Sequence, residues 1–297
     1  TSVFEPDSYF FQEGQQISYS ELFSWLERES DSSEEGLNPP IDIDKNTSTE
    51  ESIEKERKNP KYLSHTLEQD YLTRSADNVV QLAGISIGIA MKSNYRFQPE
   101  VGGPFYYENI SKKEMLSEAK PIAEEVVKRI RAKDGLQDIP IMVAIYREAA
   151  RDGLVPGNFV AKTTIQGGSQ EIGDWESIDE KYVLFPSNSA QDIDPNLSST
   201  VEEFKSEVAN YFPNYVGVIG QGFYQDGEIR SLVLEIPIEF YGQAEVIGFT
   251  QYVYGLVMDS FQPHYDIEVN IKSNDRQESL IVRKAGDEEP YVHVYQR

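Results

Sequence analysis

The chain has 297 residues, and its 27 Lys and Arg are outnumbered by 51 Asp and Glu, which gives a net charge of −24. An acidic excess of this size argues against a nucleic-acid partner and against direct adhesion to anionic lipids, because both need a basic surface. Cysteine is absent, which excludes disulfides, thiolate metal sites and cysteine nucleophiles.

Residues 1–60 predict an N-terminal helix followed by a polar arm. Ser18 and Glu21 have the spacing of a capping box, in which each side chain covers an unsatisfied backbone N–H at a helix start. The apolar residues that follow lie at helical spacing: Leu22, Trp25 and Leu26. Turn residues and a polar, charged composition then predict that residues 36–60 form a linker or wrapping arm.

Residues 61–166 predict a first α+β half. Strictly alternating apolar residues from Ile85 to Met91 indicate a strand with one buried face. A second capping box at Ser111 and Glu114 begins a long helix with one apolar face. Two more strands are expected after this helix, at residues 139–145 and 159–165.

Residues 214–297 repeat the same order of strand, helix, strand and strand, after a connecting segment with one helix at 167–213. Asp226 and Gly227 predict a hairpin turn, because this pair suits the positive φ angles that match strand twist. We therefore predict an α+β protein of two similar halves, each a mostly antiparallel sheet covered by one long helix, with an N-terminal helical arm.

No residue pattern predicts a metal site. The three histidines lie far apart in the sequence, and none has a second ligand at helical spacing: His65, His264 and His293. The acidic stretch at Asp42 begins like a calcium loop, but Thr47 and Ile53 stand where Gly and a bidentate Glu are required. We expect no metal and no cofactor, although calcium binding by an acidic loop stays open.

No catalytic motif is complete either. Ser117 and Lys120 have the Ser-x-x-Lys spacing of penicillin-binding enzymes, but the companion motifs are absent in the required form and order. Asp174, Trp175 and Glu176 are the most suggestive place for glycoside cleavage, since a Trp can stack on a sugar ring. A loop anchored by a buried Trp is the favoured explanation. We therefore expect no catalytic residue.

Polar residues outside the core patterns are the candidates for a binding site. They form three short strings: Glu68, Gln69 and Asp70; Arg151 and Asp152; and Asp174 and Trp175. The alternative to a binding role is that the residues of each string stabilise a turn or form a surface salt bridge. We favour that alternative, because surface ion pairs are common and contribute little.

Short strings spread along nearly the whole chain resemble one protein family. In chain order they include Asn59-Pro-Lys-Tyr-Leu-Ser64, Ser111-Lys-Lys-Glu-Met-Leu116, Gly173-Asp-Trp175 and Phe249-Thr-Gln-Tyr252. Together they resemble the CamS family, the sex pheromone precursor lipoproteins of Gram-positive bacteria. The resemblance implies a signal peptide before Thr1 that ends at a lipidated cysteine and supplies the pheromone. It also implies a mature domain on the extracellular face of the cytoplasmic membrane, in contact with the membrane only through its lipid anchor.

The resemblance and the incomplete catalytic motifs lead to two hypotheses for the folded part. The first is a non-enzymatic binding or scaffold module with an unidentified ligand or protein partner at the cell surface. The second is a cell-envelope enzyme that acts on cell-wall sugars or peptides. This enzyme would need a concave site and a carboxylate of raised pKa near Trp175 or the loop at 102–107.

Overall fold

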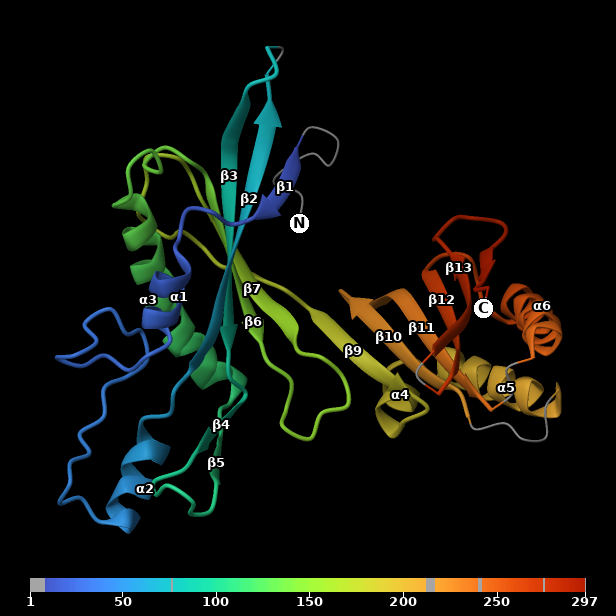
Figure 1. Cartoon of the computed structure of the whole chain (residues 1–297), viewed down its shortest axis with the longest axis horizontal. Coiled ribbons are helices and arrows are strands. Elements are labelled where there is room, and N and C mark those ends of the chain that lie inside the picture. Colours follow the sequence, from blue (N-terminus) through green and yellow to red (C-terminus); the bar gives the residue numbers. More distant parts are fainter. Residues whose placement is uncertain (1–8, 76, 212–216, 240–241, 275, 297) are drawn as a thin grey trace. The chain divides into compact units, whose positions relative to one another are not determined.

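The computed structural model describes residues 9–75, 77–211, 217–239, 242–274 and 276–296. The chain divides into two compact units, Thr1–Ile178 and Asp179–Arg297, and each has its own sheet and hydrophobic core (Figure 1). The division falls inside the segment 167–213 that the sequence suggests as a connector. Its first part belongs to the first unit, and its described residues from Asp179 onward belong to the second.

The first unit is built on a mixed sheet with strand order β1-β2-β3-β6-β7-β8, beside a separate β4-β5 hairpin. Its strands are β1 Phe10–Glu13, β2 Leu63–Arg74, β3 Val80–Met91, β4 Asn94–Phe97, β5 Tyr106–Asn109, β6 Ile141–Arg147, β7 Asn158–Ile165 and β8 Glu176–Ser177. Its helices are α1 Tyr19–Trp25, α2 Thr49–Lys58 and α3 Lys112–Arg131. Among the described strands of this sheet only the β3–β6 pair is parallel, so the sheet is mostly antiparallel as predicted.

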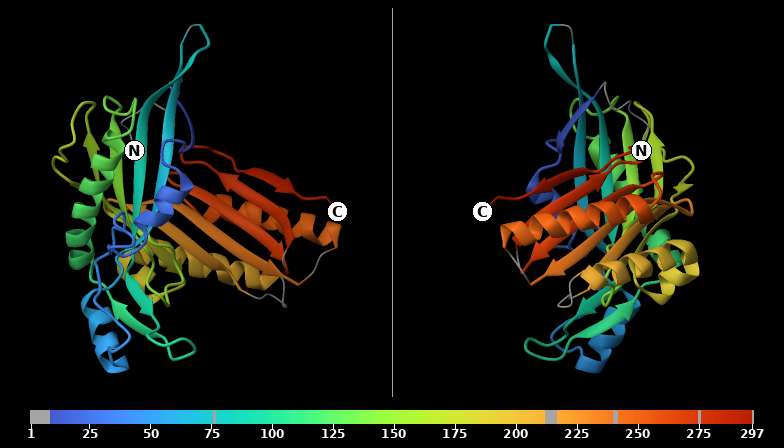
Figure 2. Two further views of the ribbon diagram at one scale, coloured as in Figure 1. Left: turned by 60° about the vertical axis from the view of Figure 1, so that its left-hand side comes forward. Right: turned by 90° about the vertical axis from the view of Figure 1, so that its right-hand side faces the viewer.

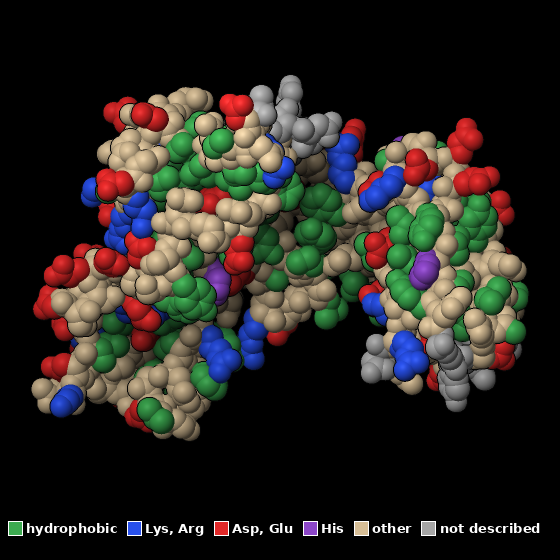
Figure 3. Space-filling view, turned by 45° about the horizontal axis from the view of Figure 1, so that its top comes forward, with side chains coloured by type: hydrophobic (Ala, Val, Ile, Leu, Met, Phe, Trp, Pro, Cys, Tyr) green, Lys and Arg blue, Asp and Glu red, His purple; other side chains and the backbone are tan. Residues whose placement is uncertain are grey.

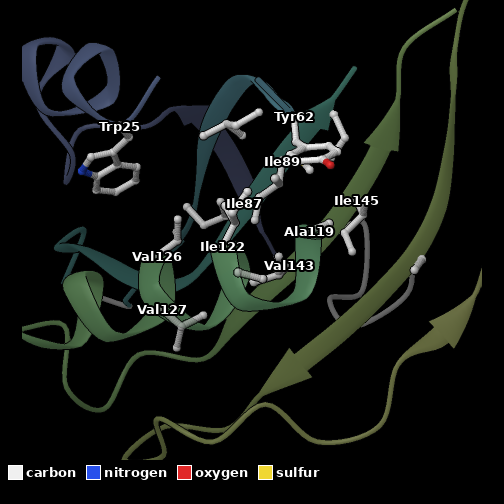
Figure 4. Packing of buried hydrophobic residues seen from close by; sticks show 14 of the residues in the cluster. Trp25, Tyr62, Ile87, Ile89, Ala119, Ile122, Val126, Val127, Val143 and Ile145 are labelled. Carbon is white, nitrogen blue, oxygen red and sulfur yellow. The ribbon is translucent and has the colours of Figure 1, made fainter. Parts of the chain in front are cut away.

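Helix α3 covers one face of this sheet and forms the first core with it. Figure 4 shows Ile122 and Val126 of α3 packed toward Ile87 of β3 and Val143 of β6. Each of these side chains is almost fully buried, which stabilises the fold by about 1.5–3 kcal/mol per residue. Trp25 at the end of α1 belongs to the same core. The predicted N-terminal helix is therefore present, and it is docked on the first unit.

The segment 36–60 is more structured than the linker or arm expected from its composition. Helix α2 lies within it, and the side chain of Ser48 accepts the backbone N–H of Glu51 at the start of this helix. Asn38 is buried, and its side-chain amide donates to the carbonyl of Leu26 and accepts from the N–H of Leu63. Helix α2 gives no signal of apolar periodicity in the sequence, because it is polar on nearly all sides.

The second unit has the strand order β14-β13-β12-β11-β10-β9. Its strands are β9 Glu180–Phe185, β10 Ile219–Gln225, β11 Glu228–Ile238, β12 Asp266–Ser273, β13 Arg276–Arg283 and β14 Tyr291–Val294. Its helices are α4 Asn188–Ile193, α5 Pro195–Tyr211 and α6 Gln243–Ser260. Asp226 and Gly227 form the predicted turn between β10 and β11, with φ angles of 55° and 79°.

The two units repeat one topology, which confirms the two similar halves. In each unit an outer strand is followed by a helical insertion, an antiparallel hairpin, a helix that crosses to a parallel strand, and two further antiparallel strands. In the second unit the long covering helix α6 is joined on this face by a second helix, α5. Figure 2 shows α5 and α6 side by side over one face, and Phe204 of α5 and Phe249 of α6 belong to the same core. None of the helices among the described residues is long and apolar enough to cross a membrane.

Candidate functional site

Glu68 and Asp70 lie on β2, on the face that also carries the core residues of β3, and both are buried. The carboxylate of Glu68 accepts the backbone N–H groups of Gln16 at 3.1 Å and Ile17 at 2.9 Å. Asp70 Oδ2 accepts the N–H of Gln15 at 3.2 Å and the side-chain amide of Gln16 at 3.0 Å. The two acids therefore hold the segment between β1 and α1 against the sheet.

This pair of carboxylates has unusual electrostatics. The pKa of Glu68 is raised from 4.5 to about 7, mainly by burial and to a smaller extent by the nearby Asp70 side chain, while the N–H groups of Ile17 and Gln16 act in the opposite direction. Asp70 Oδ1 is buried and has no hydrogen-bond partner among the described residues. A proton on Glu68 would let this carboxyl group donate a hydrogen bond to the neighbouring Asp70 side chain, which agrees with the raised pKa of Glu68.

Gln69 is separated from its two neighbours because successive side chains of a strand point to opposite faces. It is half-buried and pairs in register with Glu13 of β1. The string 68–70 therefore does not form one surface site. The side chains of Glu68 and Asp70 lie on the core face of the sheet, and the side chain of Gln69 lies on the opposite face.

Arg151 follows β6 and lies flat on an aromatic ring of the β4-β5 hairpin. Its guanidinium carbon is 3.7 Å from the ring centroid of Tyr107. Arg96 of β4 makes the same contact with Phe105, also at 3.7 Å. Arg96 and Tyr107 are cross-strand partners, so the four side chains share the exposed side of the hairpin. We call Arg96, Phe105, Tyr107 and Arg151 the arginine–aromatic face.

The charges of this face are not neutralised by neighbouring acids. Among the described residues, no carboxylate lies within ion-pair distance of Arg96 or Arg151, and both side chains are exposed. Asp152, the other member of this string, is also exposed. Acidic side chains are spread widely over the surface seen in Figure 3, so the two arginines carry positive charge on a chain that is negative overall.

The opposite side of the hairpin is buried and holds it in place. Tyr95 and Phe97 stack with ring centroids 5.3 Å apart, and Phe97 stacks on Tyr106 at 5.7 Å. The hydroxyl of Tyr95 donates to Glu56 of α2 at 2.7 Å. The arginine–aromatic face is therefore presented by a packed element rather than by a free loop.

Asp174 and Trp175 precede β8 at the far edge of the sheet. Trp175 packs against the first core and is half-buried, whereas Asp174 is exposed and its backbone carbonyl accepts the hydroxyl of Thr163 at 3.1 Å. Three strands lie between β2 and β8, which places Asp70 and Trp175 about 19 Å apart at the usual strand spacing. The structure therefore does not bring Asp70 and Trp175 together, and it places Arg151 against the β4-β5 hairpin.

A hollow of about 560 Å³ lies between residues 29–39 and helix α3. Apolar and small residues line it together with four glutamates and one arginine: Gly36, Leu37, Asn38, Pro39, Pro121, Ile122, Glu29, Glu34, Glu118, Glu125 and Arg129. The arginine is engaged, since its Nε donates to Glu125 at 2.9 Å and its Nη1 donates to the carbonyl of Glu35 at 2.7 Å. Sequence reasoning missed this hollow because one wall comes from the segment expected to be a linker.

The residues that the structure describes contain no group of three or more His, Asp or Glu that is close enough to hold a metal ion. In the acidic stretch that resembles a calcium loop, Asp44 Oδ1 accepts the N–H of Asn46 at 2.8 Å and the hydroxyl of Thr47 at 3.0 Å. This carboxylate oxygen therefore serves a local turn.

Sequence reasoning also missed three members of the arginine–aromatic face: Arg96, Phe105 and Tyr107. The available signal was the spacing of Phe105 and Tyr107, which places both rings on one side of an extended segment. The contact with Arg151 joins segments more than forty positions apart in the sequence, and local patterns carry no information about it.

Comparison with known proteins identifies the family. A family model described as CamS sex pheromone cAM373 precursor matches residues 1–289. The sex pheromone precursor of Lactobacillus salivarius subsp. salivarius UCC118 is 32% identical, with a TM-score of 0.88 over 99% of this chain and 84% of that one. The C-terminal domain of the sex pheromone staph-cAM373 precursor from Staphylococcus aureus is 31% identical, with a TM-score of 0.85 over 99% of this chain and 92% of that one. No curated protein gave a significant match. The chain therefore belongs to the CamS sex pheromone precursor family.

Proposed function

We propose that the folded part of this precursor is a non-enzymatic binding module at the cell surface, and that the pheromone comes from a signal peptide that precedes it. The observation that supports a binding role is the arginine–aromatic face. Arg96 and Arg151 are exposed, lie on aromatic rings and lack acidic partners among the described residues. Arginine and aromatic residues are enriched in protein interfaces and dominate their binding energy.

The division of labour between signal peptide and folded part is supported by the family, whose solved members are named as pheromone precursors. In this proposal a lipid on a cysteine upstream of Thr1 holds the module outside the cytoplasmic membrane. The net charge of −24 would keep the body away from an anionic bilayer, so the lipid would be its only membrane contact.

A domain exchange tests this division. The native signal peptide is fused to an unrelated secreted domain, and pheromone activity in the culture medium is compared with that of the native precursor. We expect equal release, because the folded part takes no part in maturation. Loss of release from the exchanged precursor would show that the folded part is required for maturation and would overturn this half of the proposal.

The binding role is tested by thermal unfolding of the chain with a panel of peptides, cell-wall fragments and divalent cations. A ligand present at about 100 times its dissociation constant adds roughly 2.7 kcal/mol to the stability of the folded state. We expect at least one class to raise the melting temperature of the native chain and not that of an R96Q/R151Q variant. An equal rise in the melting temperature of both proteins would show that the ligand binds outside the arginine–aromatic face.

A second candidate function, an enzyme acting on cell-wall sugars or peptides, has one observation in its favour, although the acid concerned lies on β2 and not beside Trp175 or in the loop at 102–107, where the sequence analysis expected it. Glu68 has a pKa raised to about 7, which suits a general acid near neutral pH. Its oxygens are occupied by the backbone N–H groups of Gln16 and Ile17, so a substrate would first have to displace this segment. The enzyme hypothesis would be supported if the native chain releases products from peptidoglycan fragments and the E68Q variant does not. Equal rates of product release by the native chain and E68Q, or no release by either, would rule out this hypothesis.

A further inference from the structure

We infer that the arginine–aromatic face binds an extended acidic segment of a partner protein, in which carboxylates at alternate positions contact Arg96 and Arg151. The inference rests on the binding role proposed above and names the ligand class. Its starting point is the pair of guanidinium groups, each with its carbon 3.7 Å from a ring centroid and each without a carboxylate partner among the described residues.

The orientation of the two cations leaves their hydrogen-bond donors available. A guanidinium that lies flat on a ring uses one planar face for the cation–π contact, and its N–H groups point outward in the plane. A carboxylate can approach this edge and accept two parallel hydrogen bonds. The ring contacts also restrict the arginine side chains before binding, which reduces the entropy lost when a ligand is held.

The spacing of the two cations fits an extended peptide. Phe105 and Tyr107 are two residues apart, and both rings are covered from the same side of the hairpin. Residues two apart in extended chain are separated by about 7 Å, and their side chains point the same way. A peptide strand with acidic residues at positions i and i+2 repeats its carboxylates at this same spacing. Each carboxylate would then meet one arginine.

The surroundings of the face favour a peptide over other anions. Val101 is 106% exposed and Leu154 is 79% exposed, and they lie on the loops that lead to Phe105 and follow Arg151. Exposed aliphatic groups this close along the chain to Phe105 and Arg151 suit the apolar side chains of a peptide. A glycan would need open ring faces for stacking, but the guanidinium groups cover them on the exposed side. A phosphate polymer would need a longer basic track than two arginines in a chain of net charge −24.

The platform beneath the face is held by several contacts. The stack of Tyr95, Phe97 and Tyr106 supports the hairpin from its buried side. Beyond the end of β5, the carbonyl of Ile110 accepts a hydrogen bond from Arg147 at 3.0 Å. The contact between Arg151 and Tyr107 attaches the loop after β6 to the hairpin. The two cations are therefore presented by packed structure.

The test is a titration of the full chain with the peptide Ac-Glu-Leu-Glu-Leu-Glu-NH2, followed by NMR shifts of labelled arginine and backbone groups. Two control peptides are used: one has Gln in place of each Glu, and the other has the same composition with its three Glu consecutive. We expect shifts at Arg96 and Arg151, at least tenfold weaker binding of the Gln peptide, and weaker binding of the consecutive isomer. Raising the salt concentration from 0.05 to 0.5 M should weaken binding further, because exposed charges are screened.

Two double variants distinguish binding to the arginine–aromatic face from an effect of the total charge of the chain. R96Q/R151Q should weaken binding of the alternating peptide at least tenfold. R230Q/K284Q removes the same charge from exposed positions of the second unit and should bind like the native chain. Unchanged melting temperatures establish that both variants are folded. Equal binding by the two variants, or equal affinity for the alternating and consecutive peptides, would overturn the inference. If only a cell-wall fragment or a phosphate polymer binds the face, the binding module stands and the peptide ligand is wrong.

Discussion

At the scale of single residues, Glu68 in the pair Glu68 and Asp70 shows how a buried acid can serve the fold and still titrate near neutral pH. Their oxygens accept N–H groups of residues 15–17, so removing either carboxylate would leave backbone donors unsatisfied. Because the pKa of Glu68 is raised from 4.5 to about 7, the folded state keeps a proton that the unfolded state loses between these pH values. The stability that this proton contributes is complete below pH 4.5 and is lost as the pH rises to about 7.

The substitution E68Q tests this linkage. The amide is neutral at every pH, can accept the N–H of Ile17 and can donate to Asp70 Oδ1, the oxygen without a partner among the described residues. Between pH 5 and pH 8 we expect the variant to gain up to about 3 kcal/mol relative to the native chain, because only the native chain loses stability in this range. Urea unfolding at four pH values measures the difference. E54Q, at an exposed position of α2, should follow the native chain; a parallel response of E68Q would contradict the raised pKa of Glu68.

Gly14 is a second residue whose identity follows from the acid pair. A Cβ atom at this position would lie 2.3 Å from Cγ and 2.4 Å from Cβ of Glu68, which is closer than packed atoms approach. We expect Gly14→Ala to destabilise the chain by about 1–3 kcal/mol, because Glu68 must move away from the N–H groups it accepts. Gly173→Ala is the matched control, since a Cβ atom at that position would have no other atom within 4 Å. Similar unfolding free energies for both variants would show that the segment at Gly14 adjusts freely.

At the scale of elements, α1 shows how a short helix depends on its contacts. It has seven residues, and a helix of this length is marginal in isolation. Its capping box satisfies the first turn, Lys133 forms an ion pair with Glu21 at 2.6 Å, and Trp25 enters the first core. The ion pair is partly exposed and contributes little. The burial of Trp25 is therefore the main contribution that docks this helix.

Replacing each of the two tryptophans by alanine compares the contribution of a buried side chain with that of a half-buried one. Trp25 is 2% exposed, and W25A should cost about 3–5 kcal/mol through lost burial and the cavity left behind. Trp175 is half-buried at the edge of the same core, so W175A should cost clearly less. Urea unfolding of both variants gives the two values. If W175A is the more damaging change, the loop before β8 has a greater structural role than its packing indicates.

At the scale of the whole molecule, local patterns predicted the parts of the fold that they encode. Alternation predicted β3 and β6, capping boxes predicted the starts of α1 and α3, and Asp226-Gly227 predicted the turn between β10 and β11. Helix α2 was missed because a polar helix has no apolar periodicity. The role of α5 was missed because its apolar face does not say which core it joins. The arginine–aromatic face was missed because the contact of Arg151 with Tyr107 depends on how β6 and the hairpin meet in space.

The two separate hydrophobic cores predict that the two units unfold independently. Each unit has a complete sheet with its own covering helices, and the described residues of the two cores form separate clusters. Val126 of α3 and Val253 of α6 are both fully buried, one in each core. Replacing either valine by alanine should destabilise its own unit by about 1–3 kcal/mol and leave the other unchanged. We expect two unfolding transitions in calorimetry, with V126A lowering one and V253A the other. Residue-specific hydrogen exchange assigns each transition to a unit. A single transition lowered equally by both substitutions would show instead that the two units unfold as one cooperative body.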